Sequence, residues 1–164
     1  MLSWIWLSIM VVLLDQGTKY WVMVSLIPYQ SIIVTPFFNL TLVFNTGAAF
    51  NILTAQGSLG NSILLAFALG AITVILVMLY RLSYAKILQA IALALILGGA
   101  LGNVIDRLRF GCVVDFLHFH IREYYWPAFN VADSAICMGI FLLIVFELCF
   151  ARGICHPREG GDPL

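Results

Sequence analysis

Four long apolar stretches limit what this chain can fold into more than any other feature of its sequence. They cover about residues 3–25, 62–80, 85–105 and 131–150. Each supplies the roughly 20 helical residues that are needed to cross a hydrocarbon core about 30 Å thick. Of the 164 residues, 63% are hydrophobic and only 10% are charged, unlike an ordinary water-soluble domain. We therefore predict an all-α membrane protein built as a bundle of four transmembrane helices.

The positions of the charges predict how the bundle is oriented. The eight basic and eight acidic residues cancel, so the net charge does not indicate a nucleic-acid partner. An even number of spans places both termini on one side. That side carries Arg81, Lys86, Arg152 and Arg158, and the positive-inside rule makes it cytoplasmic. Four further basic residues fall on or near the other side, among acids in motif-like segments: Lys19, Arg107, Arg109 and Arg122.

Two segments are expected outside the membrane on the far side. The first, at about residues 31–56, contains "FFNLTLVFN", whose period-two alternation predicts a strand of a small sheet. The second, "FGCVVDFLHFHIREYYWPAFN", is rich in Tyr and Trp, which favour the membrane interface. We assign residues 1–150 to a single membrane domain and the Gly/Pro-rich residues 151–164 to a disordered cytoplasmic tail.

Asp15 and Lys19 are ionisable residues inside the first apolar stretch. A charged group at mid-helix costs about 2.5–3.5 kcal/mol on insertion scales, so each one needs an explanation. The i, i+4 spacing places them on one helix face, where they can form an ion pair. A pair that only packs the bundle and a pair with a functional role remain equally open, and Lys19 is expected to extend outward towards a polar site.

Two further acids, Asp115 and Asp133, are expected to meet at the outer boundary. Asp115 lies in the apolar sequence "CVVDFL", and Asp133 begins the fourth span, where it could instead serve as a helix cap. Spans three and four are antiparallel, so the loop between them can return Asp133 to the depth of Asp115. Two carboxyl groups in a partly dry site provide a base and an acid together, which is the equipment for hydrolysing an amide.

Other interpretations of the polar residues remain open. Asp106 and Arg107 could simply mark an interfacial helix end. His118 and His120 could join Asp115 in a metal site, although no HExxH pattern supports it, and Ser134 could pair with Lys19 as a nucleophile and base. A proton-coupled transporter or a non-enzymatic scaffold could also carry buried acids.

Five short motifs occur in a characteristic order along the chain. They are "DQGTK" at 15–19, "FNTGAAF" at 44–50, "GNVIDR" at 102–107, "VVDF" at 113–116 and "FNVADS" at 129–134. In this order the chain resembles the lipoprotein signal peptidases, the bacterial signal peptidase II family of aspartyl proteases. The resemblance extends from Asp15 to about Phe150.

The resemblance implies an inner-membrane endopeptidase that removes the signal peptide of prolipoproteins before a diacylglyceryl-modified cysteine. It also implies a cradle-like outer sheet and inhibition by globomycin. We further expect a monomer in contact with membrane lipid and no metal or other cofactor. The implied catalytic pair is Asp115 and Asp133, and either one could be the base. The residues implied to bind substrate or support catalysis are Asp15, Lys19, Asn45, Gly47, Asn103, Asp106, Arg107, Asn130 and Ala132.

Overall fold

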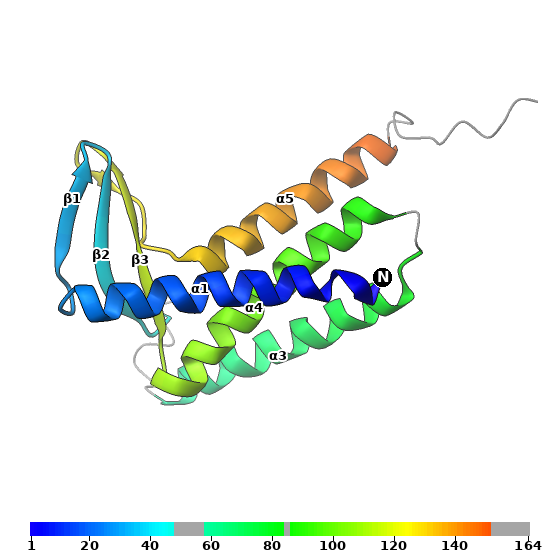
Figure 1. Cartoon of the computed structure of the whole chain (residues 1–164), viewed down its shortest axis with the longest axis horizontal. Coiled ribbons are helices and arrows are strands. Elements are labelled where there is room, and N and C mark those ends of the chain that lie inside the picture. Colours follow the sequence, from blue (N-terminus) through cyan, green and yellow to red (C-terminus); the bar gives the residue numbers. More distant parts are fainter. Residues whose placement is uncertain (48–57, 84–85, 152–164) are drawn as a thin grey trace, which may run out of the picture.

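A computed structural model describes residues 1–47, 58–83 and 86–151. Within these ranges a short 3-10 turn, Leu2–Trp4, is followed by four long helices (Figure 1): α1 (Ile5–Ser25), α3 (Ser58–Arg81), α4 (Ile87–Phe110) and α5 (Val131–Ala151). The C-terminal part of the predicted outer β segment, residues 48–56, lies outside the described residues. So does the predicted tail from residue 152 onward.

Three of these helices are long and apolar enough to cross a membrane: α3, α4 and α5 over Gly60–Arg81, Ile87–Phe110 and Val131–Cys149. The 21-residue α1 is not among them, because Asp15, Gln16 and Lys19 lower its hydropathy. Asp15 and Lys19 are buried inside the bundle rather than turned towards its surface. The outer face of α1 carries Leu13 and Leu14, both exposed.

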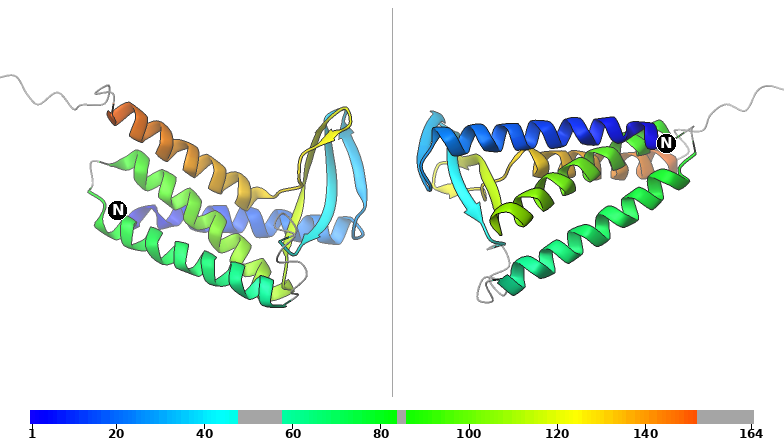
Figure 2. Two further views of the ribbon diagram at one scale, coloured as in Figure 1. Left: turned by 180° about the vertical axis from the view of Figure 1, so that it is seen from behind. Right: turned by 60° about the horizontal axis from the view of Figure 1, so that its bottom comes forward.

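The bundle is built around α4, which packs against α1, α3 and α5 and is the most buried of the candidate spans (Figure 2). Small residues allow this close packing. A Cβ atom at Gly98 would lie 2.7 Å from the Cβ of Val11 on α1, and one at Gly99 would meet the carbonyl oxygen of Ala132 on α5. The glycines of α4 therefore bring three helices close enough for their polar side chains to meet.

An antiparallel sheet crosses one end of the bundle, away from the N-terminus and the last turn of α5 (Figure 1). Its strands follow the chain in the order β1 (Ser31–Thr35), β2 (Phe38–Asn45), β3 (Val113–Ile121) and β4 (Tyr124–Tyr125). The strand predicted at "FFNLTLVFN" is confirmed by β2. The second outer segment, which we expected as a loop at the membrane interface, also belongs to the sheet, because it forms β3 and β4, and β3 pairs with β2.

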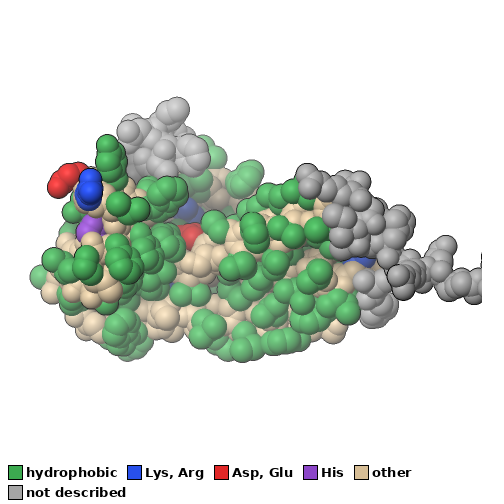
Figure 3. All heavy atoms as spheres, turned by 90° about the horizontal axis from the view of Figure 1, so that it is seen from above, with side chains coloured by type: hydrophobic (Ala, Val, Ile, Leu, Met, Phe, Trp, Pro, Cys, Tyr) green, Lys and Arg blue, Asp and Glu red, His purple; other side chains and the backbone are tan. Residues whose placement is uncertain are grey.

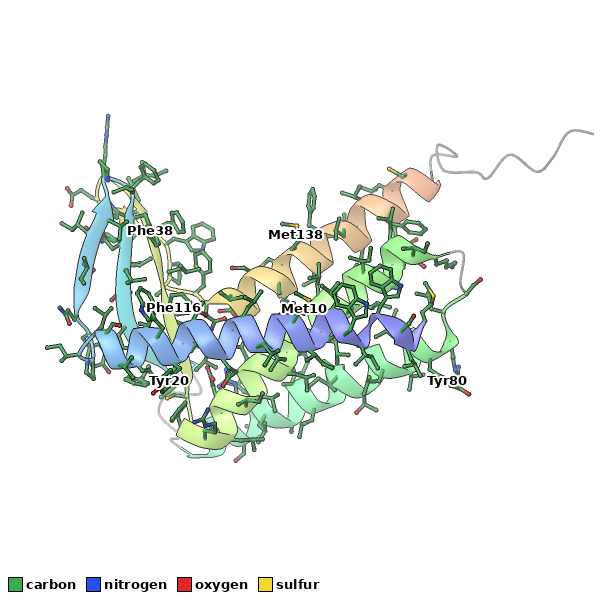
Figure 4. The ribbon with its side chains drawn as sticks, viewed as in Figure 1. Met10, Tyr20, Phe38, Tyr80, Phe116 and Met138 are labelled. Atoms are coloured by element: carbon green, nitrogen blue, oxygen red, sulfur yellow. The ribbon has the colours of Figure 1, made fainter. Side chains whose placement is uncertain are left out.

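One face of the sheet packs on the end of α1. Leu42, Val114 and Phe116 form a buried cluster with Val22 and Leu26 of α1, and Phe116 is labelled in Figure 4 where the sheet meets that helix. Successive side chains of a strand point to opposite faces. Because Val114 and Phe116 face α1, Asp115 between them faces the opposite side of the sheet.

Candidate active site

Asp115 is the third residue of β3, opposite Val43 of β2, and its side chain is almost fully buried. Each of its carboxylate oxygens accepts one amide hydrogen bond. Asn45 Nδ2 donates to Oδ2 at 2.8 Å, and Asn130 Nδ2 donates to Oδ1 at 2.7 Å. The carboxyl group is thus held in one orientation by the end of β2 and by the residue that precedes α5.

Asp133 lies in the first turn of α5 and forms a reciprocal cap with Asn130. The Asp133 backbone N–H donates to Asn130 Oδ1 at 2.9 Å, and the Asn130 N–H donates to Asp133 Oδ2 at 3.3 Å. This is a capping-box arrangement, so the helix-cap interpretation of Asp133 holds in part. The second oxygen of Asp133 accepts a hydrogen bond from Asn103 Nδ2 at 2.8 Å, which a cap alone does not need.

Asn130 joins the two acids. It is fully buried, and its Nδ2 donates to Asp115 while its backbone and Oδ1 engage Asp133. The same Nδ2 lies 3.3 Å from Asn103 Oδ1, which closes a ring of amides and carboxyl groups. The structure therefore brings Asp115 and Asp133, from β3 and α5, into one hydrogen-bonded network.

Burial makes the two acids of the network unequal. Loss of solvation, with a smaller contribution from the charge of Asp133, raises the pKa of Asp115 to about 7, although the hydrogen bonds from Asn45 and Asn130 act in the opposite direction. A carboxylic acid with this pKa carries its proton for about half the time at neutral pH. Asp133, in the first turn of α5, is only partly buried.

A second polar cluster surrounds Lys19, next to Asp115 and Asp133. The Lys19 ammonium group lies 2.8 Å from Asp15 Oδ2 and 2.7 Å from Asp106 Oδ2, and it donates to Asn103 Oδ1 at 3.3 Å. The predicted Asp15–Lys19 ion pair is confirmed. The expectation that Lys19 extends outward was wrong, because the side chain is buried and a second acid compensates its charge.

The Lys19 cluster also fixes the backbone next to each acid of the pair. Asp15 Oδ1 accepts the N–H of Ala132 at 2.9 Å, one residue before Asp133. Asp106 Oδ2 accepts the N–H of Val114 at 3.1 Å, one residue before Asp115. The predicted residues Asp15, Asp106 and Ala132 thus hold the start of α5 and of β3 in place.

Gln16 belongs to the same cluster, although the sequence patterns did not indicate it. Its Nε2 donates to Asp106 Oδ1 at 2.8 Å and contacts both Asp15 Oδ2 and the carbonyl of Gly102 at 3.2 Å. The only signal was its place inside "DQGTK", between two residues that already required partners. Gln16 carries no charge, so it does not stand out among the ionisable residues of the first apolar stretch.

Two further predicted residues flank the acids. Gly47 has φ +98° and donates its N–H to Asn45 Oδ1 at 2.9 Å, which leaves the Asn45 Nδ2 directed at Asp115. Arg107 is partly buried on α4, contacts Asn61 Oδ1 at 3.5 Å, and its charge interacts with those of Asp115 and Asp133. Acidic and basic side chains reach the surface in the hollow between the sheet and the helices (Figure 3).

The alternative sites that the sequence left open do not assemble among the described residues. The rings of His118 and His120 pack on Tyr125, at 5.4 and 5.0 Å between centroids. Over the described residues, no group of three His, Cys, Asp or Glu side chains gathers as metal ligands do. Ser134 Oγ donates to the carbonyl of Asn130 at 2.9 Å while Lys19 is engaged by its two acids, so these two do not form a nucleophile pair.

The chain is similar in sequence to known proteins. A lipoprotein signal peptidase of Pseudoalteromonas atlantica (strain T6c / ATCC BAA-1087) is 45% identical to the chain over 144 residues, which is 88% of either protein. One from Burkholderia mallei (strain SAVP1) is 49% identical over 150 residues, 92% of this chain and 90% of the relative.

The fold is also similar to that of a solved bacterial membrane enzyme. The TM-score is 0.80 at 32% sequence identity, over 89% of this chain and 92% of the other. The sequence model of signal peptidase (SPase) II matches residues 7–149. This match takes in both acids, the asparagines that join them and the whole Lys19 cluster, and the chain belongs to the signal peptidase II family.

Proposed function

We propose that this chain removes signal peptides from prolipoproteins by cutting before a diacylglyceryl-modified cysteine, with Asp115 and Asp133 as the catalytic residues. The observation that carries this proposal is the network in which Asn130 holds both carboxyl groups in unlike environments. Two such groups are sufficient to hydrolyse an amide with water, and no step needs a metal or another cofactor.

Asp133 acts as the base in the first step. Its ionised carboxylate takes a proton from a water molecule whose oxygen attacks the scissile carbonyl carbon, while Asp115 donates its proton to the carbonyl oxygen. The product of this step is a neutral tetrahedral diol, with Asp133 protonated and Asp115 ionised. The partly exposed Asp133 thus activates the water, and the buried Asp115 neutralises the developing oxyanion.

The second step restores both groups. Asp133 gives its proton to the leaving nitrogen as the C–N bond breaks, and Asp115 recovers a proton from one hydroxyl of the diol. The products are the signal peptide with a new carboxyl group and a lipoprotein with a free amino group. This order follows from the burial of Asp115 and from the helix N-terminus at Asp133.

The remaining predicted residues position this pair. Lys19, Asp15 and Asp106 fix the backbone at Ala132 and Val114, while Asn45, held by Gly47, and Asn103 orient the carboxyl groups. All of these groups come from one chain, which supports a monomeric enzyme. A cyclic peptide such as globomycin would bind in the same site by offering a backbone that is not cut.

We further infer that α1 is the fourth transmembrane helix and that the sheet forms a cradle on the outer surface of a bacterial inner membrane. The polar residues of α1 face the bundle, and its exposed residues, Leu13 and Leu14 among them, face lipid. The N-terminus and the last turn of α5 lie together at the end opposite the sheet (Figure 1), which supports a topology with both termini in the cytoplasm and the acids at the outer boundary.

The test is mass spectrometry of a diacylglyceryl-modified prolipoprotein after incubation with the purified chain. We expect a single cut directly before the modified cysteine, unaffected by EDTA. A cut elsewhere, or no cut by well-folded protein, would refute the proposed function. Activity lost in EDTA and restored by zinc would refute the mechanism while leaving the substrate assignment intact.

A further inference from the structure

One edge of the sheet is left open by the part of the chain that the structure describes. β1 (Ser31–Thr35) ends the strand order β1-β2-β3-β4, so β2 is its one neighbour among the described strands. Figure 1 shows that β1 is also the strand farthest from the helices. Its apolar side chains are exposed, Ile33 by 78% and Val34 by 55%. An exposed apolar edge of this kind is a template for pairing with another extended chain.

The open edge presents the backbone groups of Ser31 and Ile33. In an antiparallel pair, every second residue directs its N–H and C=O groups to the neighbouring strand, and the residues between direct theirs away. The Leu42 N–H donates to the Gln30 carbonyl at 3.1 Å, and Ile32 follows in the same register. Gln30 and Ile32 therefore face β2, whereas the N–H and C=O groups of Ser31 and Ile33 point to the open edge.

β1 has little of the protection that edge strands usually carry, which is a charged residue, a proline or a bulge. Its sequence, "SIIVT", contains no charge and no proline, and its register shifts only between Ile33 and Thr35. Regular pairing is therefore available over Ser31–Ile33. The opposite edge of the sheet has less room, because β4 has two residues and Leu117 of β3 already bridges to Phe129.

A second copy of the chain does not fit this edge. Two copies in one membrane have their bundles parallel, so a two-fold axis between them runs along the bundles. The edge of β1 lies on the side of the sheet away from the helices (Figure 1). Pairing it with β1 of another copy would need an axis across the bundles, which would turn the second copy upside down. The occupant is therefore an extended segment outside the membrane.

A row of apolar side chains connects the open edge to the candidate active site. Leu117 lies two residues beyond Asp115 and so on the same face of β3. It is opposite Leu40 of β2, which in turn is opposite Ile32 of β1. Neighbouring strands are about 4.8 Å apart, so a strand added to β1 would lie about 15 Å from β3. An extended chain that leaves the site across this row reaches the edge after about five residues.

We propose that the open edge of β1 binds the substrate segment that follows the modified cysteine, as an added strand. The inference rests on the proposed function, in which this segment begins at the cut bond and lies outside the membrane. Its attachment to the site gives the segment a high effective concentration near β1, which a separate protein lacks. Main-chain hydrogen bonds supply affinity for an extended chain of any sequence. Such an edge suits an enzyme whose substrates differ in the sequence after the cysteine.

The experiment varies the length of the substrate and the edge of the enzyme. Two diacylglyceryl-modified prolipoprotein peptides end either two or twelve residues after the modified cysteine, and both are given to purified wild type, Ile33→Pro and Ile33→Ala. Proline removes the N–H that points to the open edge, a change that an edge strand tolerates, and alanine keeps that N–H.

For wild type we expect kcat/KM to be about three- to ten-fold higher with the long peptide than with the short one, because two or more backbone hydrogen bonds are gained. Ile33→Pro should lose this advantage while its kcat/KM for the short peptide stays unchanged. Ile33→Ala should keep most of the advantage. Thermal unfolding of each variant shows that it is folded.

Equal kcat/KM values for the two peptides in wild type would overturn the inference and leave the edge to a separate protein outside the membrane. An equal proportional loss with both peptides in folded Ile33→Pro would also overturn it. A photoreactive side chain about five residues after the cysteine gives a readout without any mutation, because it should label residues 29–35 of wild type. Labels elsewhere would contradict the edge assignment alone, whereas wild type that cuts neither peptide would refute the proposed function itself.

Discussion

At the scale of single residues, three asparagines hold the two acids in place. Asn130 and Asn45 both donate to Asp115, and Asn103 donates to Asp133. An amide N–H stabilises the ionised form of a carboxyl group and so lowers its pKa. Burial outweighs these hydrogen bonds at Asp115, which is why its pKa is raised to about 7.

This raised pKa predicts the alkaline limit of the enzyme. Asp115 must be protonated to act as the acid, so kcat/KM should fall as the pH rises through about 7. Asn45→Leu removes a donor that favours the ionised form, so it should raise the pKa of Asp115 further and shift the alkaline limb to higher pH. Thr46→Val, at the exposed neighbouring position, is the control. A limb that stayed in place or moved to lower pH in Asn45→Leu would contradict the assignment of Asp115 as the acid.

Lys19 is the residue whose loss should most affect stability. Lys19→Met leaves Asp15 and Asp106 buried without their cation, which typically costs about 3–5 kcal/mol. We expect a markedly lower thermal unfolding temperature in detergent and loss of cleavage. Lys86→Met, at an exposed lysine on the far end of the bundle, should change neither. A Lys19→Met protein as stable as wild type would show that the cluster does not hold the fold together.

At the scale of elements, close packing around α4 brings the polar clusters together. A Cβ atom at Gly102 would lie 2.5 Å from Asp15 Oδ2 and 3.2 Å from the Cβ of Ala132. One glycine on α4 thus sets the approach of both α1 and the start of α5. The same approach allows Asp15 to reach the N–H of Ala132.

Gly102→Ala should therefore force these helices apart. Overpacking of this kind typically costs about 1–3 kcal/mol, and here it would also displace Asp133. Gly17→Ala is a matched control, because a Cβ atom at Gly17 meets nothing within 4 Å and alanine favours a helix by about 0.5–1 kcal/mol. Thermal unfolding and cleavage of both variants measure the difference. Equal behaviour of the two would contradict the packing argument.

Local sequence patterns predicted part of this arrangement. Apolar length located the helices, alternation located β2, and the i, i+4 spacing identified the Asp15–Lys19 pair. The strand β3 was missed because its first four residues are buried on both faces, which removes the alternation. The pairing of Asp106 with Lys19 was not predicted, and neither was the role of Gln16. Both depend on contacts between α1 and α4, which no local sequence pattern records.

At the scale of the whole molecule, Asp115 belongs to β3 and Asp133 to the first turn of α5, two elements that meet at the end of the bundle away from the N-terminus (Figures 1 and 2). Exposed apolar side chains cover the helices, among them Met10 and Met138, which are labelled in Figure 4. In the proposed orientation, such a molecule would receive its substrate from the bilayer, and water would reach the acids from the side of the sheet.

This orientation predicts which positions a reagent outside the cell can reach. Glu123→Cys, at the tip of the sheet, should react with a membrane-impermeant maleimide in intact spheroplasts. Arg81→Cys, at the end of α3, should react only after the membrane is permeabilised. Both changes are made in a chain whose native cysteines have been replaced. The reverse pattern would contradict cytoplasmic termini.

The proposed cleavage mechanism requires that the two carboxyl groups act together, and one measurement tests this requirement most directly. Cleavage of the diacylglyceryl-modified substrate is followed by mass spectrometry for wild type, Asp115→Asn, Asp133→Asn and the exposed control Glu123→Gln, each shown to be folded by thermal unfolding. We predict cleavage by wild type and Glu123→Gln and none by either Asp variant. Retained turnover in folded Asp115→Asn or Asp133→Asn would contradict the proposed aspartate pair.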